Sequence, residues 1–177
     1  MTERKTEIYF KMLREMRDVV FSTVAADGTP RARIIDVMLV EGEKLYFLTA
    51  AGKDFYEELM RTGFVAVTGL NSNWETIRVW GKVRNVGQDL LGRIFEENPS
   101  MNNVYPGESR YILEVFCLEE GEGEFFSLGT EPITRHPFSF GKNTYRKKDL
   151  RLQTPVSDAG SVRPPVPSRR LTREVPT

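Results

Sequence analysis

Cysteine and histidine are almost absent from this chain of 177 residues, which has one of each, Cys117 and His136. A single cysteine excludes an internal disulfide framework and a cysteine cluster site, and we expect no metal site. No apolar run approaches the roughly 20 residues that a membrane span needs. The N-terminal stretch TERKTEIYFKML is too charged for a secretory signal. These absences predict a cytoplasmic protein without a membrane partner.

Net charge is also lacking, because 25 Lys and Arg are balanced by 25 Asp and Glu. The balance fails locally, since residues 141–177 hold nine Lys and Arg, three Asp and Glu, and five of the ten prolines. Few large apolar residues are present there to offset the entropy of ordering. The sequence therefore predicts a folded domain over residues 1–141 and a basic, proline-rich, disordered tail over 142–177. Such tails can touch nucleic acid, but most are inert, and we expect no specific nucleic-acid partner.

The order of the apolar segments predicts a mainly β domain with flanking helices. Helices are expected at residues 2–18, with Thr2 as a cap, and at 53–61 and 88–97. The expected strands are rich in β-branched and aromatic residues and lie at 19–25, 31–40, 44–49, 64–70, 74–86, 111–118 and 124–128. The last two are expected to pair around a turn at 119–123, and residues 100–108 to form a loop. Because β-α-β alternation is absent, an antiparallel barrel or sandwich is favoured over a parallel sheet.

Three cations lie on or next to the two strands expected between residues 30 and 54. Arg31 and Arg33 are two residues apart, so a strand places them on the same face. The hairpin then returns the chain, and Lys53 with a fresh helix N-terminus can lie near them. Cations beside unpaired helix amides form an anion site, and phosphate is the usual occupant. A solvated strand edge remains the alternative, and Phe47 stands where a Walker A loop would need its first glycine.

Three segments in a fixed order carry a resemblance to a known family: VVFSTVAADGTPRARIIDVMLVEGEKLYFLTAAGKDFYEELMRTGFVAVTG, then IRVWGKVRNV with Gly81, then YILEVFCLEEGEGEFFSL. Over residues 8–140 the chain resembles the FMN-binding split-barrel superfamily that includes pyridoxamine 5′-phosphate oxidase. The resemblance implies a six-stranded antiparallel split β-barrel with flanking helices. It also implies a homodimer with one FMN in each of two grooves at the subunit interface.

The resemblance further implies which residues hold FMN. Arg33 and Lys53 match the cations that bind its phosphate, and Arg78 and Trp80 are candidates for contact from the partner subunit. The other positions lie on the two hairpin strands, beside the ring, the ribityl chain and the phosphate. With Arg31, which strand spacing adds, the complete set of expected cofactor-binding residues is Arg31, Arg33, Ile34, Ile35, Asp36, Leu48, Thr49, Lys53, Arg78 and Trp80. No catalytic residue is assigned.

Other side chains have simpler interpretations. Asp36 stands in an apolar strand and needs a partner, which a flavin or a neighbouring arginine can supply. Trp80 can stack near a flavin or pack in the core or a dimer contact. Glu57, Glu58 and Arg61 are interpreted as a solvated face of the helix at 53–61. Cys117 is expected to be a small buried core residue.

Departures from the family pattern concern the substrate and the tail. The oxidase contacts FMN through a tryptophan and an arginine in its C-terminal segment, where this chain has Phe126 and Arg135 or His136. The oxidase binds the phosphate of its substrate with an Arg-x-His pair. This chain has Pro132-Ile133-Thr134 in that place, so pyridoxamine phosphate is not the expected substrate. Small bacterial oxidase-like relatives continue after an FSFG-like segment into a cysteine cluster. This chain lacks those cysteines, and its tail is interpreted as out of frame or diverged.

The leading hypothesis is a homodimeric FMN-binding flavoprotein with oxidoreductase chemistry, which passes electrons between a small-molecule donor and acceptor. One alternative is a non-catalytic flavin- or haem-binding module that serves in sensing or storage. Another is a general stress-type interaction protein whose groove has lost its ligand. The sequence identifies neither the substrate nor the electron donor.

Overall fold

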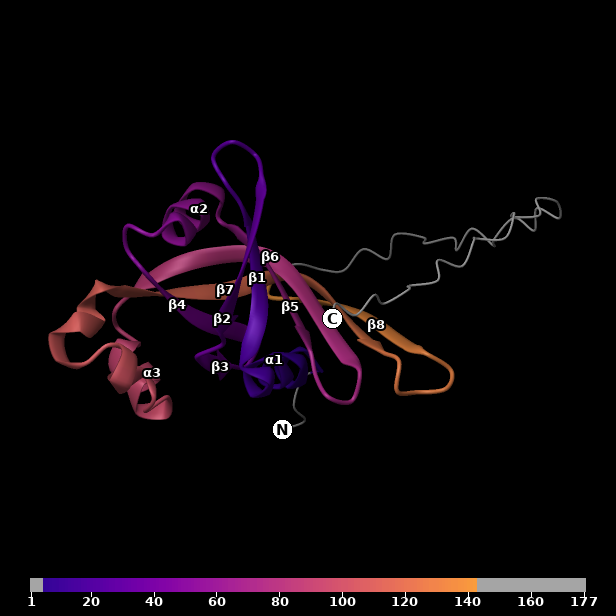
Figure 1. The fold of residues 1–177 in the computed structure, drawn as a ribbon. Helices are drawn as coiled ribbons and strands as arrows, with labels where there is room; N and C mark the ends of the chain where they lie inside the picture. The colour runs from indigo at the N-terminus through magenta and orange to yellow at the C-terminus, as the bar shows by residue number, and fades with distance from the viewer. Residues whose placement is uncertain (1–4, 143–177) are drawn as a thin grey trace, which may run out of the picture. The chain divides into compact units, whose positions relative to one another are not determined.

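A computed structural model describes residues 5–142, which form an antiparallel sheet with helices packed around it (Figure 1). The elements in chain order are α1 (Lys5–Met16), β1 (Asp18–Val24), β2 (Pro30–Asp36), β3 (Leu39–Glu41), β4 (Lys44–Ala50), α2 (Asp54–Thr62), β5 (Phe64–Leu70), β6 (Glu75–Gly87), α3 (Leu91–Glu97), α4 (Met101–Val104), η1 (Gly107–Ile112), β7 (Leu113–Ser127) and β8 (Thr134–Phe140). The expected Thr2 cap and nearly all of the expected tail lie outside the described residues. No helix within residues 5–142 is long and apolar enough to cross a membrane.

The sheet explains why the barrel is split. Its strand order is β2-β1-β5-β6-β7-β4-β3, every pair is antiparallel, and β8 pairs with β7 off this path. One edge of β7 pairs with β4 along residues 113–118 and with β8 along 121–127. The sheet therefore divides at β7, as expected for a split β-barrel with flanking helices. It has eight strands rather than six, because β3 is a short separate strand and β8 adds to the edge.

The prediction of two strands around a turn at residues 119–123 is wrong, because β7 runs through that stretch without a break. Its glycines serve close packing rather than a turn. A Cβ atom on Gly121 would lie 2.7 Å from the Cα of Gly81 and 2.9 Å from Cζ of Phe140. One on Gly123 would lie 2.8 Å from Cε2 of Phe138. The two strands that flank β7 approach so closely that side chains at these positions would clash.

Several boundaries also differ from the predictions. The strand expected at 31–40 is broken into β2 and β3, and the loop expected at 100–108 contains α4 and the start of η1. Strand β8 was not predicted. Helix α1 ends before Arg17, whose φ of 62° is left-handed, and Trp74 stands with φ of 60° in the turn before β6. A residue with positive φ cannot continue a helix or a strand, which explains both boundaries.

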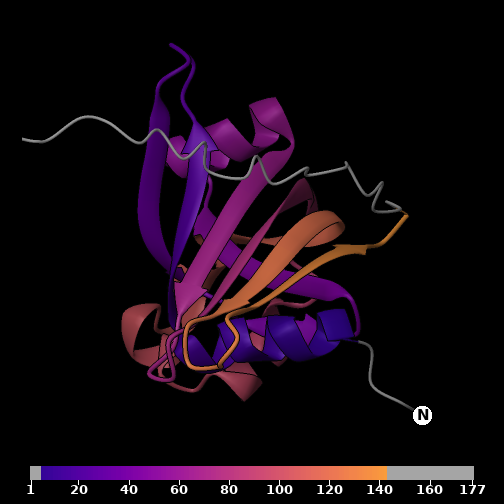
Figure 2. The same ribbon diagram turned by 90° about the vertical axis from the view of Figure 1, so that its right-hand side faces the viewer.

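Aromatic side chains fill the interior. The rings of Phe21 and Phe47 are 4.7 Å apart, and that of Phe116 lies 5.8 Å from Phe47. Helix α1 crosses one end of the strands (Figure 2) and inserts Phe10 against Phe140, with ring centroids 5.0 Å apart. A second cluster lies under α3 and includes Cys117, which is 1% exposed as predicted. The interior thus anchors the strands whose outer edges and ends form the site.

Candidate functional site

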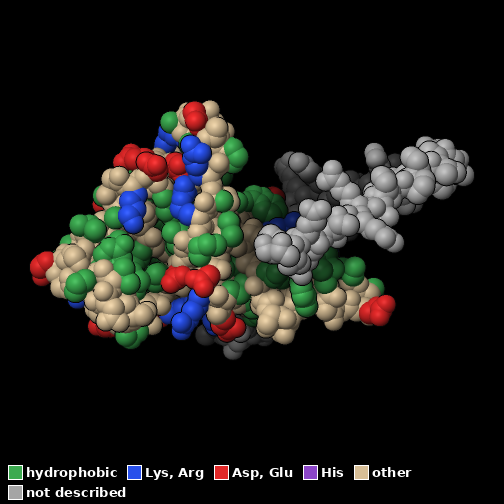
Figure 3. All heavy atoms as spheres, viewed as in Figure 1, with side chains coloured by type: hydrophobic (Ala, Val, Ile, Leu, Met, Phe, Trp, Pro, Cys, Tyr) green, Lys and Arg blue, Asp and Glu red, His purple; other side chains and the backbone are tan. Residues whose placement is uncertain are grey.

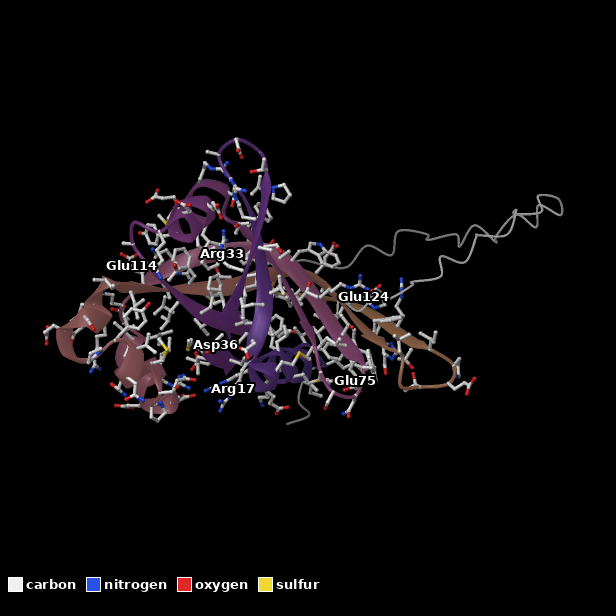
Figure 4. All side chains as sticks on the ribbon, viewed as in Figure 1. Arg17, Arg33, Asp36, Glu75, Glu114 and Glu124 are labelled. Atoms are coloured by element: carbon white, nitrogen blue, oxygen red, sulfur yellow. The ribbon has the colours of Figure 1, made fainter. Side chains whose placement is uncertain are left out.

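A cavity of about 630 Å³ opens beside β2, the start of α2 and the segment around α4. Seven of the ten implied cofactor-binding residues line it together: Arg33, Ile34, Ile35, Asp36, Leu48, Thr49 and Lys53. The opposite wall comes from Met101, Val104 and Tyr105, which the sequence placed in an uninformative loop. Figure 4 shows Arg33 toward the α2 end of β2 and Asp36 toward its α1 end. The α2 end thus holds Arg33, Lys53 and Asp54, whereas the other end holds Asp36 and Asp18.

The other three implied residues lie elsewhere. Arg31 lies on the same face of β2 as Arg33, as its spacing predicts, but it is exposed and lines a neighbouring cavity of about 650 Å³. Arg78 forms an ion pair with Glu124 at 2.7 Å, and Trp80 is 46% exposed on the outer face of β6. Neither residue lines the first cavity. Their contact with a cofactor across a subunit interface stays a prediction.

Strand β2 offers the cavity a backbone edge. It pairs with β1 along one side, and no other described strand pairs with its second side. Three consecutive residues, Ile34, Ile35 and Asp36, line the cavity. Because neighbouring side chains of a strand point to opposite faces, such a run means that the strand's edge forms the wall. Unpaired N–H and C=O groups are thus available to a flat ligand along this edge.

Lys53 and the N-terminus of α2 form the cationic end. Gly52, with φ of 83°, turns the chain out of the loop after β4. Lys53 is the N-cap in extended conformation, and no side chain caps the helix amides. Within residues 5–142 no carboxylate forms an ion pair with its ammonium group. Free helix amides and an unpaired cation together favour an anion such as phosphate.

Arg33 is held by partners that the sequence did not indicate. Its Nη2 donates to Oε2 of Glu58 at 2.8 Å, and its Nη1 donates to Oγ1 of Thr23 at 2.7 Å. The Thr23 hydroxyl in turn donates to Glu58, and the guanidinium carbon lies 4.4 Å from the ring centre of Phe55. Lys and Arg side chains (blue) and acidic ones (red) gather around α2 and the β1–β2 hairpin in Figure 3.

The interpretation of Glu58 as part of a solvated helix face is wrong, because the residue as a whole is only 5% exposed. Burial alone raises the pKa of Glu58, but hydrogen bonds from Thr23 and Arg33 and the charge of Arg33 lower it below its ordinary value. The available signal was helical spacing. Glu58 lies three residues after Phe55 and next to Leu59, on the apolar face of α2.

Asp36 lies at the other end of the cavity. In the β1–β2 register it faces Asp18. Burial, followed by repulsion from Asp18, raises the pKa of Asp36, and the charge of Arg17 partly opposes this. Within residues 5–142 no arginine forms a hydrogen bond or an ion pair with Asp36, so the expected arginine partner is not found there. An adjoining cavity of about 490 Å³ shares the lining residues Asp36, Met38 and Met101 with the first one. Arg17 also lines this second cavity.

The lining as a whole combines a cationic end, a strand edge and apolar walls from Met38, Leu48 and Phe55. Such a cavity can bind a flat, partly apolar molecule with an anionic group at one end. The single histidine, His136, lies on β8 and does not line the cavity. We therefore assign His136 no role in the cavity.

Comparisons with known proteins identify the family and the fold of the chain. A family model described as pyridoxamine 5′-phosphate oxidase matches residues 6–104, more than half of the chain. No curated protein matches the sequence.

Solved structures share the fold. A NimC/NimA family protein from Clostridium acetobutylicum is 22% identical with a TM-score of 0.65, over 77% of this chain and 95% of that one. A pyridoxamine 5′-phosphate oxidase-related, FMN-binding protein from Nostoc punctiforme is 14% identical with a TM-score of 0.53, over 78% and 93%. A heme-binding protein from Mycobacterium smegmatis is 9% identical with a TM-score of 0.58, over 78% and 60%. At these identities the similarity concerns the fold.

Proposed function

The chain belongs to the pyridoxamine 5′-phosphate oxidase family, and from that premise we propose that it is a flavoprotein whose cavity binds FMN. One observation carries the proposal: Lys53, the uncapped start of α2, Arg33 and the free edge of β2 surround the same cavity. Its volume of about 630 Å³ suits a small-molecule ligand. The Nostoc protein, which shares the fold, is described as FMN binding.

The lining residues fit FMN by their chemistry. Lys53 and the first amides of α2 would hold the phosphate, with remaining N–H groups of Arg33 beside them. The backbone from Ile34 to Asp36 would hold the ring edge, and Leu48 and Thr49 would contact the ribityl chain. Bound FMN supplies hydride and electron transfer. The protein would position the ring, exclude water and pass electrons between a small-molecule donor and acceptor.

A homodimer is part of the proposal. The outer face of β1, β5 and β6 carries exposed apolar side chains, among them Phe64, Leu70 and Trp80. Ala66 lies opposite Trp80 in the β5–β6 register, and its small side chain does not cover the indole ring. A second copy covering this face would bury these side chains. It would also bring Arg78 and Trp80 toward the partner's cavity, as the family resemblance implies.

Haem is the second candidate ligand. Met38, Met101 and Tyr105 line the cavity, and methionine and tyrosine side chains can ligate haem iron. The Mycobacterium protein that shares the fold is described as heme binding. A non-catalytic sensor or storage module would use the same cavity in this case.

Titration of the purified protein with FMN, riboflavin and haemin, followed by absorbance and fluorescence, tests the proposal. FMN should bind, and Lys53→Ala should weaken FMN about tenfold while changing riboflavin little, because a charge-assisted contact to phosphate is lost. Lys44→Ala, at the exposed start of β4, is the matched control. Failure of the wild-type protein to bind FMN would contradict the proposal. Tight binding of haemin alone would support the second candidate.

A further inference from the structure

Arg33 reaches the cavity with its charge already paired. Its guanidinium group lies 2.8 Å from the Glu58 carboxylate and contacts the Thr23 hydroxyl at 2.7 Å. Arg33 lines the cavity and Glu58 does not, so a ligand meets the arginine and not the carboxylate. The Arg33 side chain is 23% exposed and that of Glu58 is 7% exposed, so water screens this ion pair weakly.

A paired guanidinium group still donates hydrogen bonds. Arginine has five N–H donors, and the contacts with Thr23 and Glu58 use two of them. The ring of Phe55, 4.4 Å from the guanidinium carbon, helps to fix the plane in which the remaining donors lie. Arg33 can therefore donate to an oxygen atom in the cavity while the Arg33–Glu58 pair as a whole adds little net charge.

Lys53 differs from Arg33 in this respect. No carboxylate within the described residues forms an ion pair with it, and its side chain lines the same cavity. The attraction for a phosphate at this end then comes mainly from Lys53 and the amides of α2, and the carboxylate of Asp54, which lines the same cavity, opposes it. Arg33 helps to orient the phosphate through hydrogen bonds. These hydrogen bonds depend on geometry rather than on long-range attraction, because the Arg33–Glu58 pair is neutral as a whole.

We infer that Glu58 is a specificity-determining residue, which limits how strongly the cavity distinguishes FMN from riboflavin by cancelling the charge of Arg33. This inference rests on the proposed FMN site. The ring and ribityl contacts supply a larger share of the affinity than they would beside two unpaired cations. FMN binding by the wild-type protein should consequently depend only weakly on salt.

Glu58→Gln and Glu57→Gln test the inference as a matched pair. Both remove one negative charge from adjacent positions of α2, but Glu57 is exposed and does not contact Arg33. The measured quantity is the ratio of FMN affinity to riboflavin affinity at low and high salt. Glu58→Gln should raise this ratio about tenfold at low salt and steepen its salt dependence, because the charge of Arg33 is released. Glu57→Gln should change the ratio by less than about twofold.

A second set of variants keeps the test valid if Glu58→Gln folds poorly. Arg33→Gln leaves a buried carboxylate near the phosphate and should lower the ratio about tenfold. The double variant Arg33→Gln with Glu58→Gln removes both charges and should recover most of that loss. An unchanged or lowered ratio in folded Glu58→Gln, or no recovery in the double variant, would overturn the inference while FMN binding by the wild type stands. Absence of FMN binding by the wild type would overturn the proposed function as well.

Discussion

A buried carboxylate on a short helix requires partners, and Glu58 has two. Hydrogen bonds from Thr23 and Arg33 satisfy one of its oxygens, and the arginine supplies the opposite charge. Removing one partner of a buried pair leaves the other charge without compensation, which costs more than the pair itself contributes. The residue that shapes the charge of the cavity is thus also a residue on which the packing of α2 depends.

Acid should reveal this dependence. Because the pKa of Glu58 is lowered in the folded protein, its contribution to stability is present above the ordinary glutamate value, about 4.3, and is lost as the pH falls through the lowered pKa. Glu58→Gln should be less stable than wild type by about 3 kcal/mol at neutral pH. The difference should shrink toward pH 3. Urea unfolding across this pH range measures it, and a difference independent of pH would contradict the expectation.

The sequence alone brought Arg33 and Lys53 together, because strand spacing and a hairpin are local features. It could not show the pairing of Arg33, since Thr23 and Glu58 come from other elements and meet it only in the folded sheet. Helical spacing did place Glu58 beside Phe55, but a glutamate among charged neighbours is usually solvated. Local charge composition therefore pointed the wrong way at this residue.

At the scale of elements, β6 and β7 approach each other through facing glycines. Gly81 and Gly121 are opposite in the register, and a Cβ atom on Gly121 would meet the backbone of Trp80 and Gly81. Backbone atoms cannot move aside as a flexible side chain can. The closeness of these strands explains why a glycine-rich stretch runs straight through the middle of the sheet.

Gly121→Ala should therefore destabilise the protein by about 3 kcal/mol, the upper part of the usual range for overpacking. Gly92→Ala is the matched control, because a Cβ atom there meets nothing within 4 Å. It lies in α3 and should stabilise the fold by about 0.5 kcal/mol through helix propensity. Thermal or urea unfolding distinguishes them. Equal stability of the two variants would mean that β6 and β7 separate without cost.

The strand through residues 119–123 could not be predicted, because glycine marks both turns and close approaches, and only the neighbouring strand decides between them. The opposite wall of the cavity was not predicted for another reason. Met101, Val104 and Tyr105 belong to a four-residue helix and the residue after it, and such short elements leave no periodic signal. The strands with clear alternation, such as β6 around Ile77 and Val79, were predicted correctly.

At the scale of the whole molecule, the outer sheet face is the surface on which the proposed dimer depends. Trp80→Glu places a charge in the middle of this face and should weaken self-association at least about tenfold. Tyr111→Glu is the control, because Tyr111 is a similarly exposed aromatic side chain, 55% against 46%, in η1 rather than on this face. Sedimentation velocity or light scattering measures the effect. A wild-type monomer, or equal association of both variants, would contradict the proposed interface.

One edge of β7 pairs first with β4 and then with β8, and this arrangement affects where such chains can vary in sequence. Strand β8 pairs with β7 along residues 121–127, and none of its residues lines the cavity. Sequence change on β8 can therefore accumulate without altering the cavity lining of the same subunit.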